Sequence, residues 1–281
     1  MFPVFAGCDN RLSYVLRSTV APLPKDILRF AGKGILKRGP RLPLPVLGRF
    51  FREAVTGIEL NFRGAFFSRE GKLLAEVPQF ARLRHLQAFD ISLNELQRAA
   101  GLPNEDAQFL MIADRGIKLG PGFSTGTLTA TYFNDRTFAC YRNSIFARPV
   151  NEFSHHRPVG FRSIAPQVVV TEEIESSAFF CNFSSDHRYD FTANPTARLY
   201  RGKEDFLEAS FGAIAPQGGV ERSITDIFGD AAIDFLRPAG GYGTLIASQN
   251  GVTLTSIHLL RNRRTGSMSI EHSRPTHSYV T

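Results

Sequence analysis

The feature that most limits the possible folds is a series of short apolar segments separated by turn residues. Segments of four to seven residues rich in Val, Ile, Thr, Phe and Tyr alternate with Gly, Asn, Asp and Pro clusters, as at 167–171 and 178–183. Helical patterns are confined to short stretches, such as 93–100 and 223–228. Frequent turns and few helices favour a mainly β fold of the β-sandwich type over a parallel α/β fold.

The chain also carries a diverged internal repeat. Its matches run in the same order in both halves: 64–76 with 196–208, 89–91 with 225–227, 109–119 with 244–254, and 133–149 with 260–275. Each match is weak alone, but a shared order is the signature of repeated units. The repeat predicts two tandem, duplicated β-sandwich units preceded by a short basic helical extension.

This pattern divides the chain into four predicted parts. They are a basic amphipathic N-terminal segment at 1–56, a first unit at 57–150, a linker at 151–166 and a second unit at 167–281. The linker is predicted from its prolines, which break regular structure. Asn250-Gly251 predicts a β-hairpin in the second unit, because both central positions of such a turn need positive φ. Arg115-Gly116 stands at the matching turn of the first unit.

The charge of the chain is concentrated at one end. Residues 1–52 hold ten Lys and Arg against two Asp, a net charge of +8, whereas the whole chain has +7. Short amphipathic helices with Leu, Ile and Phe on one side are predicted at 24–31 and 46–54. This asymmetry predicts an anionic partner, and the cations expected to bind it are Arg29, Lys33, Lys37, Arg38, Arg41, Arg49 and Arg52.

Three readings of the basic segment remain open. A membrane surface or an acidic protein groove selects segments that are both basic and apolar. Nucleic acid is an alternative, since phosphates need only the cations. The third reading is an extension that wraps the body with its cations in water.

Several short motifs follow one another in the second unit: a strand pair around 197–200, then 214–216, 223–227, 247–248 before a turn, and 272–274. In this order the second unit, over about 176–281, resembles the small β-sandwich family of bacterial sensory rhodopsin transducers. Residues 60–150 resemble it less clearly. The resemblance implies a non-enzymatic, oligomeric interaction domain. The duplication and the basic segment depart from that family.

Histidines provide the alternative of a metalloprotein or enzyme. A site between the two units would draw on His156, His187 and His272, because neutral imidazoles are common metal ligands. The spacings match no known metal motif, and neither HExxH nor GxSxG occurs. No catalytic residue is therefore predicted, and the sequence does not identify a cofactor.

The three cysteines, Cys8, Cys140 and Cys181, are too far apart to form a CxxC pair or a zinc-finger pattern. Cys140 and Cys181 lie in apolar segments and are expected to be buried thiols. Without a long apolar stretch or a secretory signal, we expect a cytoplasmic protein that can attach to the periphery of a membrane.

Together these patterns predict a non-catalytic interaction or accessory protein, either a homo-oligomer or a subunit of a larger complex. Its basic N-terminus would dock on a membrane surface or a membrane-associated complex.

Overall fold

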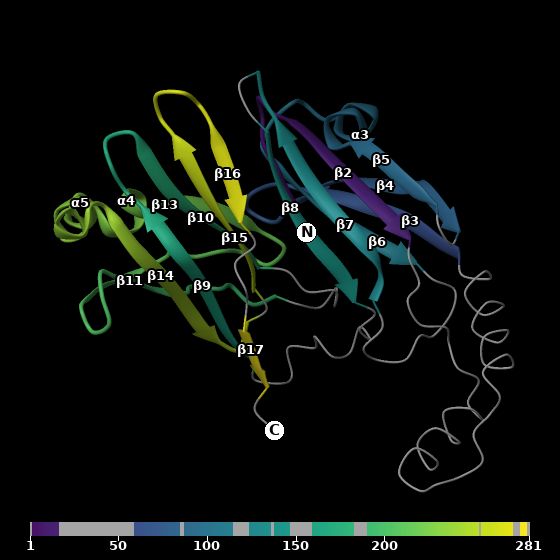
Figure 1. Ribbon diagram of the computed structural model, residues 1–281. Helices are drawn as coiled ribbons and strands as arrows, with labels where there is room; N and C mark the ends of the chain where they lie inside the picture. Colours follow the sequence, from purple (N-terminus) through teal and green to yellow (C-terminus); the bar gives the residue numbers. More distant parts are fainter. Residues whose placement is uncertain are drawn as a thin grey trace, which may run out of the picture.

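The computed structural model describes residues 2–16, 59–84, 87–114, 124–135, 138–146, 159–182, 190–252, 254–271 and 276–279. Within these ranges the chain is mainly β, with four sheets whose strands all pair antiparallel (Figure 1). The prediction of a mainly β fold is confirmed. None of the helices in these ranges is long and apolar enough to cross a bilayer.

The first two sheets pack face to face and form the first sheet pair, on the right of Figure 1. Sheet A has the strand order β1-β6-β3-β4, and sheet B has the order β5-β2-β7-β8. The elements are β1 (Phe2–Val4), β2 (Asp9–Leu16), β3 (Glu59–Phe67), β4 (Leu73–Arg84), β5 (Ala88–Ser92), α3 (Leu93–Ala99), β6 (Ala107–Asp114), β7 (Ser124–Phe133) and β8 (Phe138–Phe146).

The other two sheets form the second sheet pair, on the left of Figure 1. Sheet C has the order β12-β11-β14-β9-β17, and sheet D has the order β13-β10-β15-β16. The elements are β9 (Val159–Val169), β10 (Ile174–Asn182), β11 (Thr196–Tyr200), β12 (Phe206–Ser210), β13 (Gly219–Ser223), α4 (Ile224–Phe228), α5 (Ala231–Leu236), the 3-10 helix η2 (Arg237–Ala239), β14 (Tyr242–Asn250), β15 (Leu254–Asn262), β16 (Met268–Glu271) and β17 (Thr276–Tyr279).

The two sheet pairs have the same strand order. Replacing β1 to β8 by β9 to β16 converts sheet A into sheet C and sheet B into sheet D, with β17 as an added edge strand. Buried hydrogen bonds coincide as well: the Phe5 N–H donates to Asn10 Oδ1 at 2.9 Å, and the Val169 N–H donates to Ser176 Oγ at 2.7 Å. Asn10 on β2 and Ser176 on β10 stand one residue before Arg11 and Ser177, which pair with Ser92 and Ser223 on equivalent strands.

The two predicted short helices are present and begin at equivalent serines. Ser92 caps α3 by accepting from the Glu95 N–H, and Ser223 caps α4 in a capping box with Asp226. These caps correct one match of the repeat, because 89–91 lies in β5 whereas 225–227 lies in α4. The residues before the cap extend β5, and those after it form a helical turn, so a shared Asp-Ile pair did not indicate equivalence.

The hairpin predicted at Asn250-Gly251 is wrong. Gly251 does have a φ of +76°, but it joins β14 in sheet C to β15 in sheet D. Each of these strands already has a partner on both sides, so neither can pair with the other. The matching turn at 115–116 lies outside the described residues, between β6 in sheet A and β7 in sheet B.

Two predicted boundaries also need correction. The segment 1–56 does not stand apart from the body, because β1 and β2 belong to sheets A and B. The predicted linker 151–166 overlaps β9. The prolines suggested a break in regular structure, but proline is tolerated at a β-bulge. Pro166 lies at such a place, where the pairing of β9 with β14 shifts register between Ala165 and Val168. The predicted helices at 24–31 and 46–54 lie outside the described residues.

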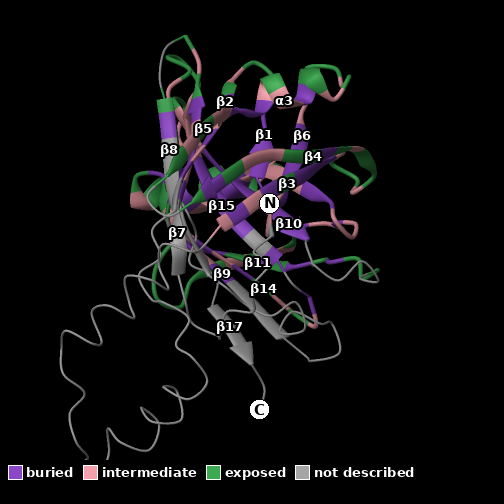
Figure 2. Ribbon diagram, turned by 90° about the vertical axis from the view of Figure 1, so that its right-hand side faces the viewer, coloured by how far each residue is buried: buried purple, intermediate pink, exposed green. Residues whose placement is uncertain are grey.

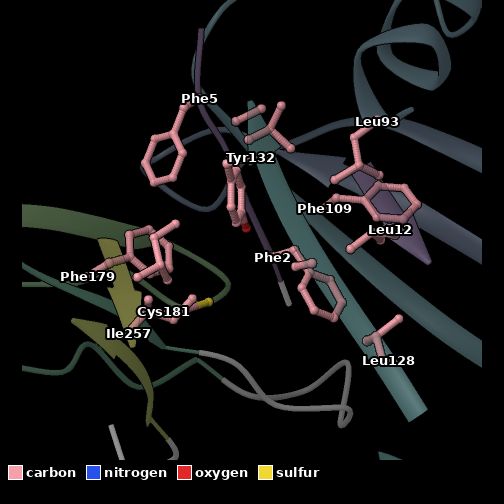
Figure 3. Packing of buried hydrophobic residues seen from close by; sticks show 14 of the residues in the cluster. Phe2, Phe5, Leu12, Leu93, Phe109, Leu128, Tyr132, Phe179, Cys181 and Ile257 are labelled. Atoms are coloured by element: carbon pink, nitrogen blue, oxygen red, sulfur yellow. The ribbon is translucent and has the colours of Figure 1, made fainter. Parts of the chain in front are cut away.

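Within sheet D, the strands β10 and β15 are buried on both faces over much of their described length, and they lie where the two sheet pairs meet (Figure 2). Along β10, Phe180 points into the core of the second sheet pair, with its ring 4.5 Å from that of Phe211. The alternate residues Phe179 and Cys181 point the other way and join the cluster that contains Phe2 (Figure 3). Because successive side chains in a strand face opposite ways, β10 needs an unbroken apolar run. One of the two hydrophobic clusters therefore contains residues from both sheet pairs, and the other lies within the second sheet pair.

Candidate functional site

The residues predicted to form sites fall outside the described part of the chain. This holds for the seven predicted binding cations, Arg29, Lys33, Lys37, Arg38, Arg41, Arg49 and Arg52, and for the histidines His156, His187 and His272. Among the described residues, no group of three or more His, Cys, Asp or Glu side chains is placed to hold a metal ion.

The topology shows that the basic segment is not an N-terminal extension but a connection between two strands. Forty-two residues, 17–58, connect β2 to β3, whereas only thirteen residues, 183–195, make the equivalent connection from β10 to β11. Residues 17–58 contain nine Lys and Arg and two acidic residues, so their net charge of +7 equals that of the whole chain. The basic segment is therefore an internal insertion joined at both ends to a body with no net charge.

A cleft of about 350 Å³ lies where the two sheet pairs meet. Phe5, Cys8 and Asp106 line it from the first sheet pair, and Arg261 and Met268 line it from the second. The sequence predicted histidines between the two units, whereas arginines, carboxylates and a thiol line this cleft.

An arginine–carboxylate pair forms one wall of the cleft. The Glu221 carboxylate accepts hydrogen bonds from both terminal nitrogens of Arg261, with Nη2 at 3.1 Å from Oε2. It also accepts a hydrogen bond from Ser177 Oγ at 2.6 Å. The Arg261 guanidinium carbon lies 5.7 Å from the centroid of the Phe5 ring across the junction. Burial opposes the charge of Arg261, but the hydrogen bond and charge of Glu221 outweigh burial and raise the pKa of Arg261.

The opposite wall carries a second ion pair, Arg69 with Asp106, and Asp106 also accepts from the Ala6 N–H at 2.7 Å. The Cys8 thiol lies in this environment. Burial raises the pKa of Cys8, the charge of Arg261 lowers it and that of Asp106 raises it, with a net upward shift. Because the thiolate is the reactive form of cysteine, this environment does not activate Cys8 as a nucleophile.

Beside the cleft, a polar contact fixes the junction between the sheet pairs. The Cys181 thiol donates to Gln108 Oε1 at 3.2 Å, and Gln108 Nε2 donates to the Gly219 carbonyl at 3.3 Å. The Gly219 N–H donates to the Arg69 carbonyl at 3.0 Å. A Cβ on Gly219 would lie 2.5 Å from the Gln108 side chain, so any larger residue there would force the buried Gln108 amide to move.

One buried titratable group was not predicted from the sequence. His258 on β15 is 1% exposed, and neither of its ring nitrogens has a hydrogen-bond partner. Burial lowers its pKa to about 4, so the ring is neutral at neutral pH. The only sequence signal was its place in an apolar strand, which is compatible with either face of the sheet.

No protein-family model matches the chain, and no curated protein sequence matches it. Function must therefore be argued from its own residues. In the cleft, the arginines and carboxylates satisfy one another and the thiol is not activated, so the arrangement favours binding or structural roles over covalent chemistry.

Proposed function

We propose that the chain is a non-catalytic accessory protein that docks on an anionic membrane surface through the basic insertion, residues 17–58. The observation that carries this proposal is the distribution of charge: the insertion has the full net charge of +7, and the rest of the chain sums to zero. Each Lys or Arg held near an anionic bilayer contributes about 1 kcal/mol of attraction.

The composition of the insertion supports a lipid surface over nucleic acid. Besides its nine cations, the insertion contains fifteen Val, Ile, Leu and Phe residues. A bilayer interface binds cations through its headgroups and apolar side chains through the underlying acyl region. Nucleic-acid phosphates would use the cations and leave most of the apolar residues without a role.

The body supports a scaffold role in this proposal. We infer that the two sheet pairs are duplicated copies of one β-sandwich unit, on the strength of their common strand order. The resemblance to sensory rhodopsin transducers, an interaction family, remains a proposal about the origin of that unit. A duplicated scaffold that presents one charged insertion is suited to recruiting a membrane-associated complex.

Flotation with lipid vesicles tests the proposal. We expect the full chain to float with phosphatidylcholine–phosphatidylserine vesicles at low salt and not with phosphatidylcholine alone. The matched variant replaces 17–58 with a thirteen-residue Gly/Ser linker, the length of the equivalent connection at 183–195, and should stay at the bottom of the gradient. A cooperative thermal transition would show that this variant is folded.

Two outcomes would overturn the proposal. One is equal flotation of the full chain and the linker variant. The other is binding of DNA or RNA with a steep salt dependence and no vesicle binding, which would make the insertion a nucleic-acid-binding segment.

A further inference from the structure

The second candidate site is a polar cavity of about 440 Å³ beside α3, here termed the α3 cavity. It lies where β2 meets the start of α3, in the first sheet pair. Its lining includes Asp9, Arg11, Ser92, Glu95, Gln97 and Arg98.

The second sheet pair has an equivalent arrangement at the start of α4. Arg11 pairs with the cap Ser92, and Ser177 pairs with the cap Ser223, so Asp9 and Glu175 hold equivalent positions two residues earlier. Both carboxylates are tied to the cap region of the following helix. Ser92 Oγ donates to Asp9 at 3.2 Å, and Thr225, in the first turn of α4, donates to Glu175 at 2.5 Å.

In the second sheet pair an arginine of the chain itself satisfies this carboxylate. Arg263 places Nη2 at 2.7 Å and Nε at 3.2 Å from Glu175 Oε2. Arg263 lies two residues beyond Arg261, the strand partner of Glu175. The α4 arrangement therefore holds a guanidinium.

In the first sheet pair, the position equivalent to Arg263 is not an arginine. The strand partner of Asp9 is Phe133, and two residues beyond it stands Asp135, an acid in place of Arg263. Among the described residues, the cation that pairs with Asp9 is Arg11, with Nη1 at 3.7 Å. However, Arg11 directs Nε and Nη2 to Asp90, at 3.3 and 3.0 Å. Within the described part of the chain, Asp9 therefore has only a distant ion pair with Arg11, whereas its counterpart Glu175 has a close ion pair with Arg263.

A second observation at the same cavity is a buried hydrogen-bond acceptor without a donor. The Gln97 side chain is 2% exposed, and its Nε2 donates to the carbonyls of Pro103 and Glu105 at 2.8 and 2.9 Å. Its Oε1 accepts no hydrogen bond. A buried acceptor without a donor is costly, and a bound donor group would remove that cost.

We propose that the α3 cavity binds the guanidinium group of an arginine, supplied by a partner protein or as the free amino acid. A planar fork of N–H donors suits Asp9 and the neighbouring carboxylate Glu95, as the Arg263–Glu175 pair does in the second sheet pair. Arg98 lies on the same wall and offers a contact for the α-carboxylate of free arginine.

Calorimetric titration of the full chain tests this proposal with three probes. L-Arginine and N-acetyl-L-arginine amide should both bind, whereas L-citrulline, which has nearly the same shape without the charge, should not. The two sources are distinguished by the carboxylate: tighter binding of L-arginine indicates the free amino acid, and equal or tighter binding of the amide indicates an arginine side chain.

Three substitutions sharpen the test. Asp9→Asn should weaken arginine binding about tenfold, the scale of one charged hydrogen bond. Asp205→Asn, which removes a similarly exposed carboxylate from the Arg201–Asp205 pair, should leave binding unchanged. Asp135→Arg should abolish binding, because it restores the arginine that the second sheet pair has at the equivalent place.

The proposal is independent of membrane docking, so the linker variant lacking 17–58 should still bind arginine. Equal responses to arginine and citrulline would overturn it, as would equal affinities of the Asp9→Asn and Asp205→Asn variants. If Asp9→Asn does not fold, the folded Asp135→Arg variant decides the matter, since undiminished arginine binding there contradicts the proposal.

Discussion

Protonation of His258 should destabilise the fold in mildly acidic solution. The ring is buried without a hydrogen-bond partner, and its pKa is about 4 in the folded chain against 6.5 for the free side chain. Between these values the unfolded chain binds a proton that the folded chain does not. Stability is therefore fully present above pH 6.5 and declines as the pH falls toward about 4. A difference of this size corresponds to about 3 kcal/mol.

The assay is urea unfolding at neutral pH and at several lower pH values, comparing the wild type with His258→Leu. Leucine has a similar volume and does not titrate, so the variant should lose about 3 kcal/mol less between neutral pH and about pH 4. At neutral pH the variant should be at least as stable as the wild type, because it removes two unsatisfied nitrogens. Parallel stability–pH curves for the two proteins would refute the reasoning.

Two further substitutions, with one control substitution, test the packing. Gly219→Ala should destabilise the junction by about 1–3 kcal/mol, since its Cβ would lie 2.5 Å from Gln108, while Gly202→Ala, at a position with open space, should change stability by less than about 0.5 kcal/mol. Phe180→Ala should cost about 3–5 kcal/mol, because the ring is 1% exposed and packs against Phe211. Urea unfolding measures all three, and equal effects of the two glycine substitutions, or a loss below about 1 kcal/mol for Phe180→Ala, would contradict this description of the core.

Local sequence was sufficient where local chemistry decides the structure. The alternation of apolar and turn residues predicted strands, and helical patterns predicted the short helices at 93–100 and 223–228. The structure has α3 and α4 there, each beginning after a serine whose oxygen caps a free N–H. Most matches of the predicted repeat fall on strands with equivalent positions, such as β3 and β11.

Strand pairing was not predictable from local sequence. Asn250-Gly251 specified a turn with positive φ, but the partners of β14 and β15 depend on distant strands. The double burial of β10 likewise depends on the first sheet pair, although its uninterrupted apolar run was a signal that could have been used.

The candidate sites were harder still to predict, because their residues are brought together from distant positions. Three arginines follow closely in the sequence at 261–264, and nothing near them in the chain identifies their partners. The structure places Arg261 against Glu221 in the cleft and Arg263 against Glu175 near α4. The absence of a matching arginine beside Asp9 becomes visible only when the two sheet pairs are compared.

The measurement that tests membrane docking most directly is flotation of a variant in which the nine Lys and Arg residues of 17–58 are replaced by Gln. This change keeps the length and the apolar residues of the insertion and removes only its positive charge. We predict that the wild type floats with phosphatidylserine-containing vesicles at low salt and that the variant does not. Undiminished flotation of the variant would contradict docking through the basic insertion.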